Sequence, residues 1–391
     1  MYAWGKRMKR SRSLINLRLF VFLVAGLSGF CSWSERSEVP PSVEFTWMSN
    51  TNWLIETPEV RILLDGWITR IPRPPRPDIN DVRTLSVPPV LPDTEGITRV
   101  FDSLGDKRID YILSGHSHFD HSFDTAVWAR LTGAHVIGPK STCLQAFAQG
   151  IPEAQCSIIN GRETFDLGGG LKVRVVRWHH SGDISTPIGL LLQTPMELKE
   201  MPSPDSETGG LRPGILEDFP IGGGCWAYLF TLDHPEHPLS WFYSNSGNPN
   251  TFYESKIVDQ AFIDKYGIDM TNLEIIPQEK SIEEYLIEAV EAQGLESVDL
   301  WLGYNNSLHV KQVISVMRPD AFIPQHWGGL WSDFFKGLQS PYSNERLISV
   351  LREEGIDFFP QTQFMDKYRL DKAGVIPVTN DEVKKRLGFV Q

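Results

Sequence analysis

Four side chains able to bind metal ions lie within six consecutive positions near residue 120. His116, His118, Asp120 and His121 form the pattern H-x-H-x-D-H in a chain that contains only 10 His. They follow the apolar run 109–113, which predicts a buried strand that ends just before them. Imidazole nitrogens and carboxylate oxygens are ligands of Zn²⁺ and similar metals. Because one tetrahedral ion needs fewer ligands from a single loop, the pattern predicts two metal ions bridged by water or hydroxide.

The chemistry expected of such a site is hydrolysis. A metal ion lowers the pKa of a bound water toward neutrality, and Asp120 is placed to orient that water or to take its proton. The hydroxide would attack an ester, lactone, amide or phosphoester, while the ion stabilises the developing oxyanion. No G-x-S-x-G motif and no phosphate-binding loop competes with this interpretation. A histidine-rich surface loop that binds nothing is the alternative.

The composition is that of a globular protein with an acidic surface. The 391 residues are 41% hydrophobic and 22% charged, and the net charge is −12 at pH 7. This charge argues against non-specific binding to nucleic acid or to anionic lipid. We therefore expect a small-molecule substrate, and the sequence gives no indication of the oligomeric state.

The N-terminal segment has the pattern of a secretory signal. An apolar stretch at 19–31 is too short for an ordinary membrane span and follows a cluster of basic residues. We expect a signal peptide at 1–31, a linker at 32–42 and one folded domain at 43–391. The protein would then be exported to the periplasm or secreted, and an uncleaved membrane anchor is the alternative. The basic residues are Lys6, Arg7, Lys9, Arg10 and Arg12.

Export would permit disulfides, but cysteines are few. The chain has 4 Cys, of which Cys143, Cys156 and Cys225 lie beyond the signal. Three cysteines allow at most one internal disulfide, for which Cys143 and Cys156 are candidates. We expect instead that all three are buried, small apolar side chains.

Strands and helices alternate along the chain, which predicts an α/β protein. Ser281 as N-cap, Glu284 in a capping box and Gly294 at the end mark the clearest helix. The order of elements favours two packed sheets with helices outside. Strands are expected at 43–67 (two, with a turn), 109–113, 134–138, 171–178, 188–194, 225–232, 239–245, 298–304 and 320–325, and further helices at 122–132, 141–149, 309–319 and 343–355.

Two segments lack these patterns and are expected to be insertion loops. The segment 68–93 is rich in Pro, and 195–224 is rich in Pro, Gly and acidic residues. We expect both to overhang the cleft and to set substrate specificity. The acidic residues of the second loop disfavour a polyanionic substrate.

The order of these motifs resembles the metallo-β-lactamase superfamily. The opening hairpin ends at Asp65, the H-x-H-x-D-H loop follows a strand, and "VRVVRWHHSGD" (173–183) and "IPQHWG" (323–328) supply further histidines. The nearest branches are the ascorbate-6-phosphate lactonase-like hydrolases and the N-acylphosphatidylethanolamine phospholipase D-like enzymes. The resemblance implies a four-layer αββα sandwich of two mixed sheets with helices outside.

The resemblance also implies two sets of ligands. Site one would hold His116, His118 and either His180, which we favour, or His179. Site two would hold Asp120, His121 and His326. The ions would be one or two Zn²⁺, with Mn²⁺ or Fe²⁺ as alternatives.

Asn245 departs from the family pattern. Superfamily members usually have an Asp bridging both metals at this point, after a strand, but here the sequence reads "FYSNSGN". A neutral amide cannot compensate the charge of two cations as a carboxylate does. The second site would then be weak, or would prefer another metal, or the chain would have kept metal or ligand binding with reduced catalysis. Asp183 and Asp233 are the candidate replacements.

Other histidines and aromatic residues have weaker signals. His309 begins a predicted helix and could line the mouth of a pocket. Trp327 and Trp331 follow His326 closely and would wall either the cleft or the core. We expect no role in the site for His135, His234 and His237.

Overall fold

The computed structural model describes residues 41–72 and 87–390. The expected signal peptide at 1–31 and almost all of the expected linker at 32–42 lie outside these residues, as does the middle of the 68–93 segment. Among the described residues, every helix is too short or too polar to cross a membrane.

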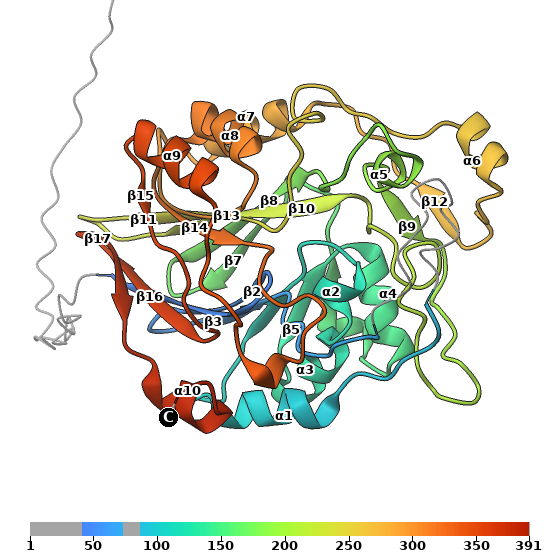
Figure 1. The fold of residues 1–391 in the computed structure, drawn as a ribbon, viewed down its shortest axis with the longest axis horizontal. Coiled ribbons are helices and arrows are strands. Elements are labelled where there is room, and N and C mark those ends of the chain that lie inside the picture. The colour runs from blue at the N-terminus through green and yellow to red at the C-terminus, as the bar shows by residue number, and fades with distance from the viewer. Residues whose placement is uncertain (1–40, 73–86, 391) are drawn as a thin grey trace, which may run out of the picture. The chain divides into compact units, whose positions relative to one another are not determined.

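Two mixed β-sheets are stacked face to face (Figure 1). In the first sheet, β3 to β6 run parallel and the other neighbours antiparallel. In spatial order it contains β17 (Gly374–Val378), β16 (Asp366–Asp371), β1 (Val43–Ser49), β2 (Asn52–Glu56), β3 (Arg61–Leu64), β4 (Tyr111–Leu113), β5 (His135–Gly138) and β6 (Cys156–Ile158).

The second sheet combines a parallel half with an antiparallel half. β11, β13, β14 and β15 run parallel, and the neighbours on the other side run antiparallel. In spatial order it contains β15 (Asp357–Phe358), β14 (Pro319–Gln325), β13 (Val298–Tyr304), β11 (Leu239–Ser244), β10 (Cys225–Leu232), β8 (Leu171–Trp178) and β7 (Thr164–Gly168).

Helices cover the outer faces of both sheets (Figure 1). The first sheet is covered by α1 (Thr94–Ser103), α3 (Thr125–Thr132), α4 (Lys140–Ala148) and α10 (Asp381–Leu387), and the second by α7 (Ile282–Ala292), α8 (Ser307–Met317) and α9 (Glu345–Glu353). This arrangement confirms the predicted four-layer αββα sandwich. Shorter helices are α2 (Phe119–Ser122), α5 (Pro187–Leu191), α6 (Gln260–Tyr266), η2 (Glu153–Gln155) and η3 (Phe334–Lys336).

The central strands are apolar on both faces because each face meets a different layer. Along β11, Trp241 and Tyr243 belong to the core cluster between the sheets, whereas Phe242 packs in the cluster beneath α7 to α9. Successive side chains of a strand point to opposite faces, so a strand buried on both sides reads as a continuous apolar run. The run "LSWFYS" therefore marks an interior strand.

The capping pattern of α7 is confirmed. The Ser281 side chain accepts from the Glu284 backbone N–H, and the Glu284 side chain accepts in return from the Ser281 N–H. Gly294, just after the helix, has φ of 65°, a left-handed conformation that glycine adopts without strain.

Three predictions of local structure differ from the structure. The segment 43–67, expected to contain two strands, contains β1, β2 and β3. The expected strand at 188–194 is largely helix α5, because the Thr186 side chain accepts from the Gly189 N–H and Pro187 occupies the first turn. The expected loop at 195–224 contains strand β9 (Met196–Leu198), which pairs with β12 (Leu273–Ile275). The residues of β9 gain their partner from a segment distant in the sequence, so no local pattern reveals it.

The expectation that every cysteine is a free, buried side chain was also wrong. Cys143 on α4 and Cys156 on β6 form a disulfide, with their Cα atoms 5.8 Å apart. Cys225, in contrast, is a buried free thiol. The disulfide joins a helix of the outer layer to the edge strand of the first sheet.

Candidate metal centre

The candidate ligands come together because four strands end at the same edge of the two sheets. The H-x-H-x-D-H loop follows β4, His180 comes two residues after the end of β8, and His326 directly follows β14. Asn245 directly follows β11. Residues more than 200 positions apart in the sequence therefore meet in one buried cluster.

The first group of donor atoms comes from His116, His118 and His180. Nε2 of His116 lies 3.1 Å from Nδ1 of His118. The ring of His180 lies 5.1 Å from that of His116 and 4.8 Å from that of His118. Nδ1 of His180 is 2.6 Å from the Ser181 carbonyl oxygen. When Nδ1–H donates to that carbonyl, Nε2 is left with its lone pair free for a metal.

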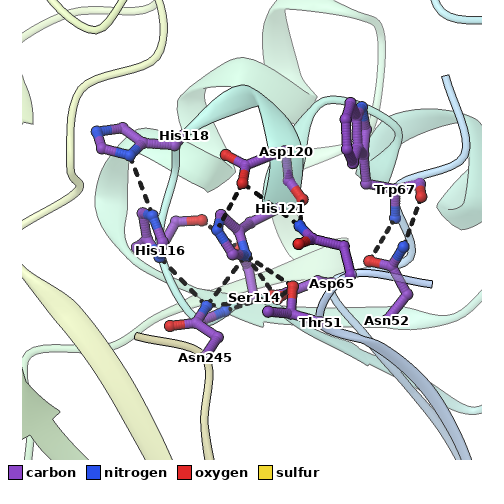
Figure 2. Close-up of polar contacts among 12 residues, drawn as sticks. Thr51, Asn52, Asp65, Trp67, Ser114, His116, His118, Asp120, His121 and Asn245 are labelled. Carbon is purple, nitrogen blue, oxygen red and sulfur yellow. Dashed lines mark hydrogen bonds and ion pairs between the residues drawn. The ribbon is translucent and has the colours of Figure 1, made fainter. Parts of the chain in front are cut away.

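The second group contains Asp120, His121 and His326. Oδ2 of Asp120 lies 3.3 Å from Nε2 of His121 and 3.6 Å from Nε2 of His326. His116, Asp120 and His121 are also close enough together to hold one ion, so His116 lies within reach of both groups. Figure 2 shows how His116 and Asp120 approach His121 from two sides.

The donor set fits a metal ion. Ligand atoms of a tetrahedral zinc site lie about 3.3 Å apart, since each is about 2.0–2.1 Å from the metal. The distances of 3.1, 3.3 and 3.6 Å in the two groups match this spacing. Nε2 of His118 is buried and makes no hydrogen bond within the described part of the chain. A buried nitrogen without a partner is costly unless a ligand satisfies it.

The protonation states also suit a cation. Burial and the neighbouring imidazoles hold the pKa values of His116 and His118 well below the usual value, so both rings are neutral donors. Burial lowers the pKa of His180 to about 4. Burial also opposes charge on His121, but the Asp120 and Asp65 carboxylates overcome it and raise its pKa to about 10. A metal ion would take the place of that positive charge.

Asp65 orients His121 from behind. It ends the β3 segment, is fully buried, and its Oδ2 lies 2.7 Å from Nδ1 of His121. The Thr51 and Tyr243 hydroxyls donate to the same oxygen, and the Gly115 N–H donates to Oδ1. A carboxylate that accepts from one ring nitrogen fixes the tautomer and leaves the other nitrogen for a metal.

The β1–β2 turn supports the second group. The Asn50 amide donates to the backbone oxygen and to Oδ2 of Asp120, each at 3.4 Å. The His326 N–H donates in turn to the Asn50 carbonyl. Asn50, Asp65 and His326 all have positive φ, at 44°, 57° and 60°. Left-handed backbone is uncommon outside glycine and gathers at functional sites. The sequence analysis missed Asn50, Thr51 and Tyr243, which carry no local motif.

Asn245 lies below His116 and His121 in Figure 2, on the side away from Asp120. Its amide nitrogen is 3.2 Å from Nδ1 of His116, 3.2 Å from Nδ1 of His121 and 3.3 Å from Oδ2 of Asp65. Each of these Nδ1 atoms is on the opposite side of its ring from the Nε2 atom that approaches His118 or Asp120. In this position Asn245 contacts one histidine of each group and, together with Asp65, supports the ligands.

His180, and not His179, belongs to the cluster. Nδ1 of His179 lies 2.8 Å from the Thr251 hydroxyl, and its Nε2 accepts from the Asn248 N–H. His179 packs instead against His309, 4.9 Å between ring centres. His309 is fully buried, so it does not line the mouth of a pocket.

The remaining candidates lie elsewhere. Asp183 is exposed and accepts from the Ser185 hydroxyl, and Asp233 pairs with Lys172 at the surface. Neither contributes to the cluster. Trp327 packs against buried Trp47, whereas Trp331 is 36% exposed and packs against Phe119. His135 contacts Ser157, and His234 and His237 lie in the turn between β10 and β11.

The two mixed sheets, the outer helices and the H-x-H-x-D-H loop at the sheet edge form the arrangement that the sequence resemblance implied. The chain has the metallo-β-lactamase fold.

Among curated proteins, this chain is similar to UPF0173 metal-dependent hydrolases. One from Pyrobaculum islandicum is 26% identical over 153 residues, which are 39% of this chain and 57% of the relative. One from Pyrobaculum arsenaticum is 27% identical over the same lengths. One from Anaeromyxobacter sp. (strain K) is 28% identical over 143 residues, which are 36% of this chain and 43% of the relative.

The match thus spans little more than half the length of the Pyrobaculum relatives, and no family model matches the chain. Among solved structures, a metallo hydrolase from Ignicoccus hospitalis is 13% identical with a TM-score of 0.44, covering 84% of this chain and 99% of that one. A metallo-β-lactamase-fold protein from Bacillus subtilis is 9% identical with a TM-score of 0.39, covering 84% and 99%.

Proposed function

We propose that this protein is a metal-dependent hydrolase acting on a small molecule with an ester, lactone or phosphoester bond. The observation that carries the proposal is the pair of donor groups, in which three pairs of donor atoms lie 3.1 to 3.6 Å apart and the ring of His180 packs against those of His116 and His118. The similarity to curated metal-dependent hydrolases supports it.

Different residues of the chain would bind the metal ions and transfer the proton. One or two Zn²⁺ ions, or Mn²⁺ or Fe²⁺, would supply a water of lowered pKa and polarise the bond to be cleaved. His116, His118 and His180 would hold one ion, and Asp120, His121 and His326 the other. Burial raises the pKa of Asp120, but the neighbouring imidazoles lower it more, so the carboxylate stays ionised. An ionised Asp120 can hold the attacking water and accept its proton.

The test combines metal analysis with a substrate panel. Purified protein is stripped with a chelator, reloaded with Zn²⁺, Mn²⁺ or Fe²⁺, and assayed on esters, lactones and phosphodiesters. We expect metal-dependent turnover that Asp120→Ala abolishes while the protein remains folded. His116→Ala should lose bound metal, whereas His234→Ala, a histidine in the β10–β11 turn, should not. A protein that binds no metal and cleaves no substrate would refute the proposal.

A second candidate is a metal- or ligand-binding protein with reduced catalysis. The neutral Asn245 at the end of β11 favours it, because Asp120 is then the one carboxylate among the candidate ligands and an amide does not compensate the charge of two cations. Tight metal binding with no turnover on the same panel would support this candidate over the first.

We also propose that the protein is exported. The disulfide between Cys143 and Cys156 supports this, because stable disulfides form mainly outside the cytosol. The basic and apolar N-terminal segment supports it as well. Cell fractionation would test whether the protein is exported and whether it stays with the membrane. N-terminal sequencing of the mature protein would test whether the signal is cleaved.

A further inference from the structure

A pocket of about 490 Å³ lies along the segment that follows His326, a member of the second donor group. It is formed by the segment that follows His326 and by residues 338–344, which precede α9. The metal ligands themselves do not line it. Its wall begins with Trp327, the residue that follows His326 in the chain.

Hydrogen bonds connect the lining of the pocket to the backbone of His326. The Asn305 side chain lines the pocket and donates to the carbonyls of Gln325 and His326, at 2.9 and 3.2 Å. The Asn344 side chain, which also lines the pocket, donates to the Asn305 carbonyl. The pocket is therefore tied to the backbone of a candidate ligand.

The shape of the pocket is held by packing. The Trp327 ring stacks on buried Trp47, 5.1 Å between ring centres, and its Nε1 donates to Gln361. Gly328 has φ of 72°, and a Cβ there would lie 2.8 Å from Leu338. A side chain at this position would clash with Leu338, so the glycine allows the backbone to pack closely against Leu338 in the pocket wall.

The lining is uncharged. It combines aromatic rings and one leucine with amides and hydroxyls, and it contains no Asp, Glu, Lys, Arg or His. Four other surface pockets of the described residues each contain charged side chains, as with Arg318 and Asp320 in one of them. The lack of charge thus distinguishes this pocket from those four.

Tyr342 adds a polar group to the lining. Its side chain is largely buried at the pocket, and its hydroxyl lies beside the Asn344 side chain, which also lines the pocket.

We infer that this pocket binds an uncharged, partly aromatic or apolar portion of the substrate. The inference rests on the proposed hydrolase function and narrows it toward neutral carboxylic esters and lactones. A carboxylate or phosphate in the pocket would lose its hydration with no cation to replace it. A pocket of this size with aromatic walls and a few amides and hydroxyls is typical of small-molecule sites.

The first test measures binding without turnover. Calorimetry would compare 2-naphthol with 2-naphthalenesulfonate, a similar ring bearing an anion, on zinc-loaded and on chelator-treated protein. We expect 2-naphthol to bind at least about tenfold more tightly in both forms. Ser343→Trp, which fills the pocket from an exposed position, should weaken 2-naphthol binding at least about tenfold. Ser315→Trp, the same change in a charged pocket on α8, is the matched control.

The second test measures turnover of 2-naphthyl butyrate and bis(4-nitrophenyl) phosphate. Ser343→Trp should raise KM for the naphthyl ester about tenfold with unchanged metal content, and Ser315→Trp should change it less than about twofold. Ser340→Trp, also exposed on the rim, repeats the test if Ser343→Trp does not fold.

The outcomes separate the two proposals. Naphthol binding that Ser343→Trp removes, with no ester cleaved, would uphold the pocket and refute the hydrolase. Ester turnover with a KM that Ser343→Trp leaves unchanged, or equal binding of the sulfonate, would refute the pocket and leave the hydrolase standing.

Discussion

Asp65 concentrates several interactions on one buried carboxylate. Thr51, Tyr243, His121 and Asn245 all approach its Oδ2 atom. Burial alone would raise its pKa, but His121 and the hydrogen bonds lower it overall, so it is an anion in the folded protein. Its role is to hold the histidine, and through it the geometry of the second donor group.

Replacing Asn245 by Asp tests this arrangement. The amide nitrogen of Asn245 lies 3.3 Å from Asp65 Oδ2, so Asn245→Asp places two buried carboxylates in contact. We expect the metal-free variant to lose about 1–3 kcal/mol of unfolding free energy at pH 7. Urea denaturation in the presence of chelator would measure the loss.

Asn250→Asp, an exposed position of the same loop, is the matched control and should change stability by less than about 0.5 kcal/mol. Equal stability of Asn245→Asp and wild type would mean that the side chain at 245 does not face Asp65 in solution.

At the scale of elements, a buried carboxyl joins β9 to α4. Oε2 of Glu197 accepts from the Ser141 N–H at 2.7 Å and from the Ser141 hydroxyl. Burial raises its pKa to about 7, although these hydrogen bonds lower it. Strand β9 belongs to the segment expected to be a loop, so this contact helps fix that segment on the fold.

The raised pKa predicts a specific pH dependence. The unfolded chain loses this proton near pH 4.5, but the folded protein keeps it up to about pH 7. Stability should therefore fall as pH rises from about 4.5 to 7, by about 3 kcal/mol from this group. Glu197→Gln cannot ionise and should be more stable than wild type at pH 8, with the difference shrinking toward pH 5.

Thermal melts of both proteins at pH 5, 6.5 and 8 would measure the effect. Glu200→Gln, an exposed glutamate of the same segment, should follow the wild-type curve. A Glu197→Gln variant that is no more stable than wild type at pH 8 would show that Glu197 is ionised without cost.

The disulfide between α4 and β6 predicts a second effect on stability. It closes a loop between residues 13 positions apart, and loops of this size gain about 3 kcal/mol from cross-linking. The double variant Cys143→Ala, Cys156→Ala should lose a similar free energy of unfolding. Alkylation of the denatured, non-reduced protein should modify Cys225 but neither of the other two, and labelling of Cys143 would contradict the disulfide.

At the scale of the whole molecule, metal binding should stabilise the fold, because the ligands come from both sheets. An ion that binds only the folded protein at 100 times its Kd adds about 2.7 kcal/mol, or about 4 °C in melting temperature for a domain of this size. Chelator-treated protein titrated with Zn²⁺ should show this rise by calorimetry. The rise in melting temperature should disappear in the double variant His116→Ala, Asp120→Ala. If the melting temperature of the wild-type protein does not rise with Zn²⁺, the result would argue against a metal site.

Much of the fold could be predicted because its signals are local. The capping box of α7, the apolar runs of β10 and β11 and the alternation of strands and helices each lie within a short window. Strand β9 could not, because its partner strand β12 is distant in the sequence. Helix α5 did have a local signal, the N-cap Thr186 followed by Pro187, but its apolar run was interpreted as a strand.

The sequence by itself determined that His116, His118, Asp120 and His121 lie together, because they share one loop after one strand. It left His179 and His180 as alternatives, and only the tertiary structure separates them, through the contacts of His179 with Thr251 and Asn248. The support of the site by Asn50, Thr51 and Tyr243, the disulfide and the uncharged pocket were likewise decided in three dimensions. Each depends on segments that are far apart in the chain and meet only when the two sheets pack.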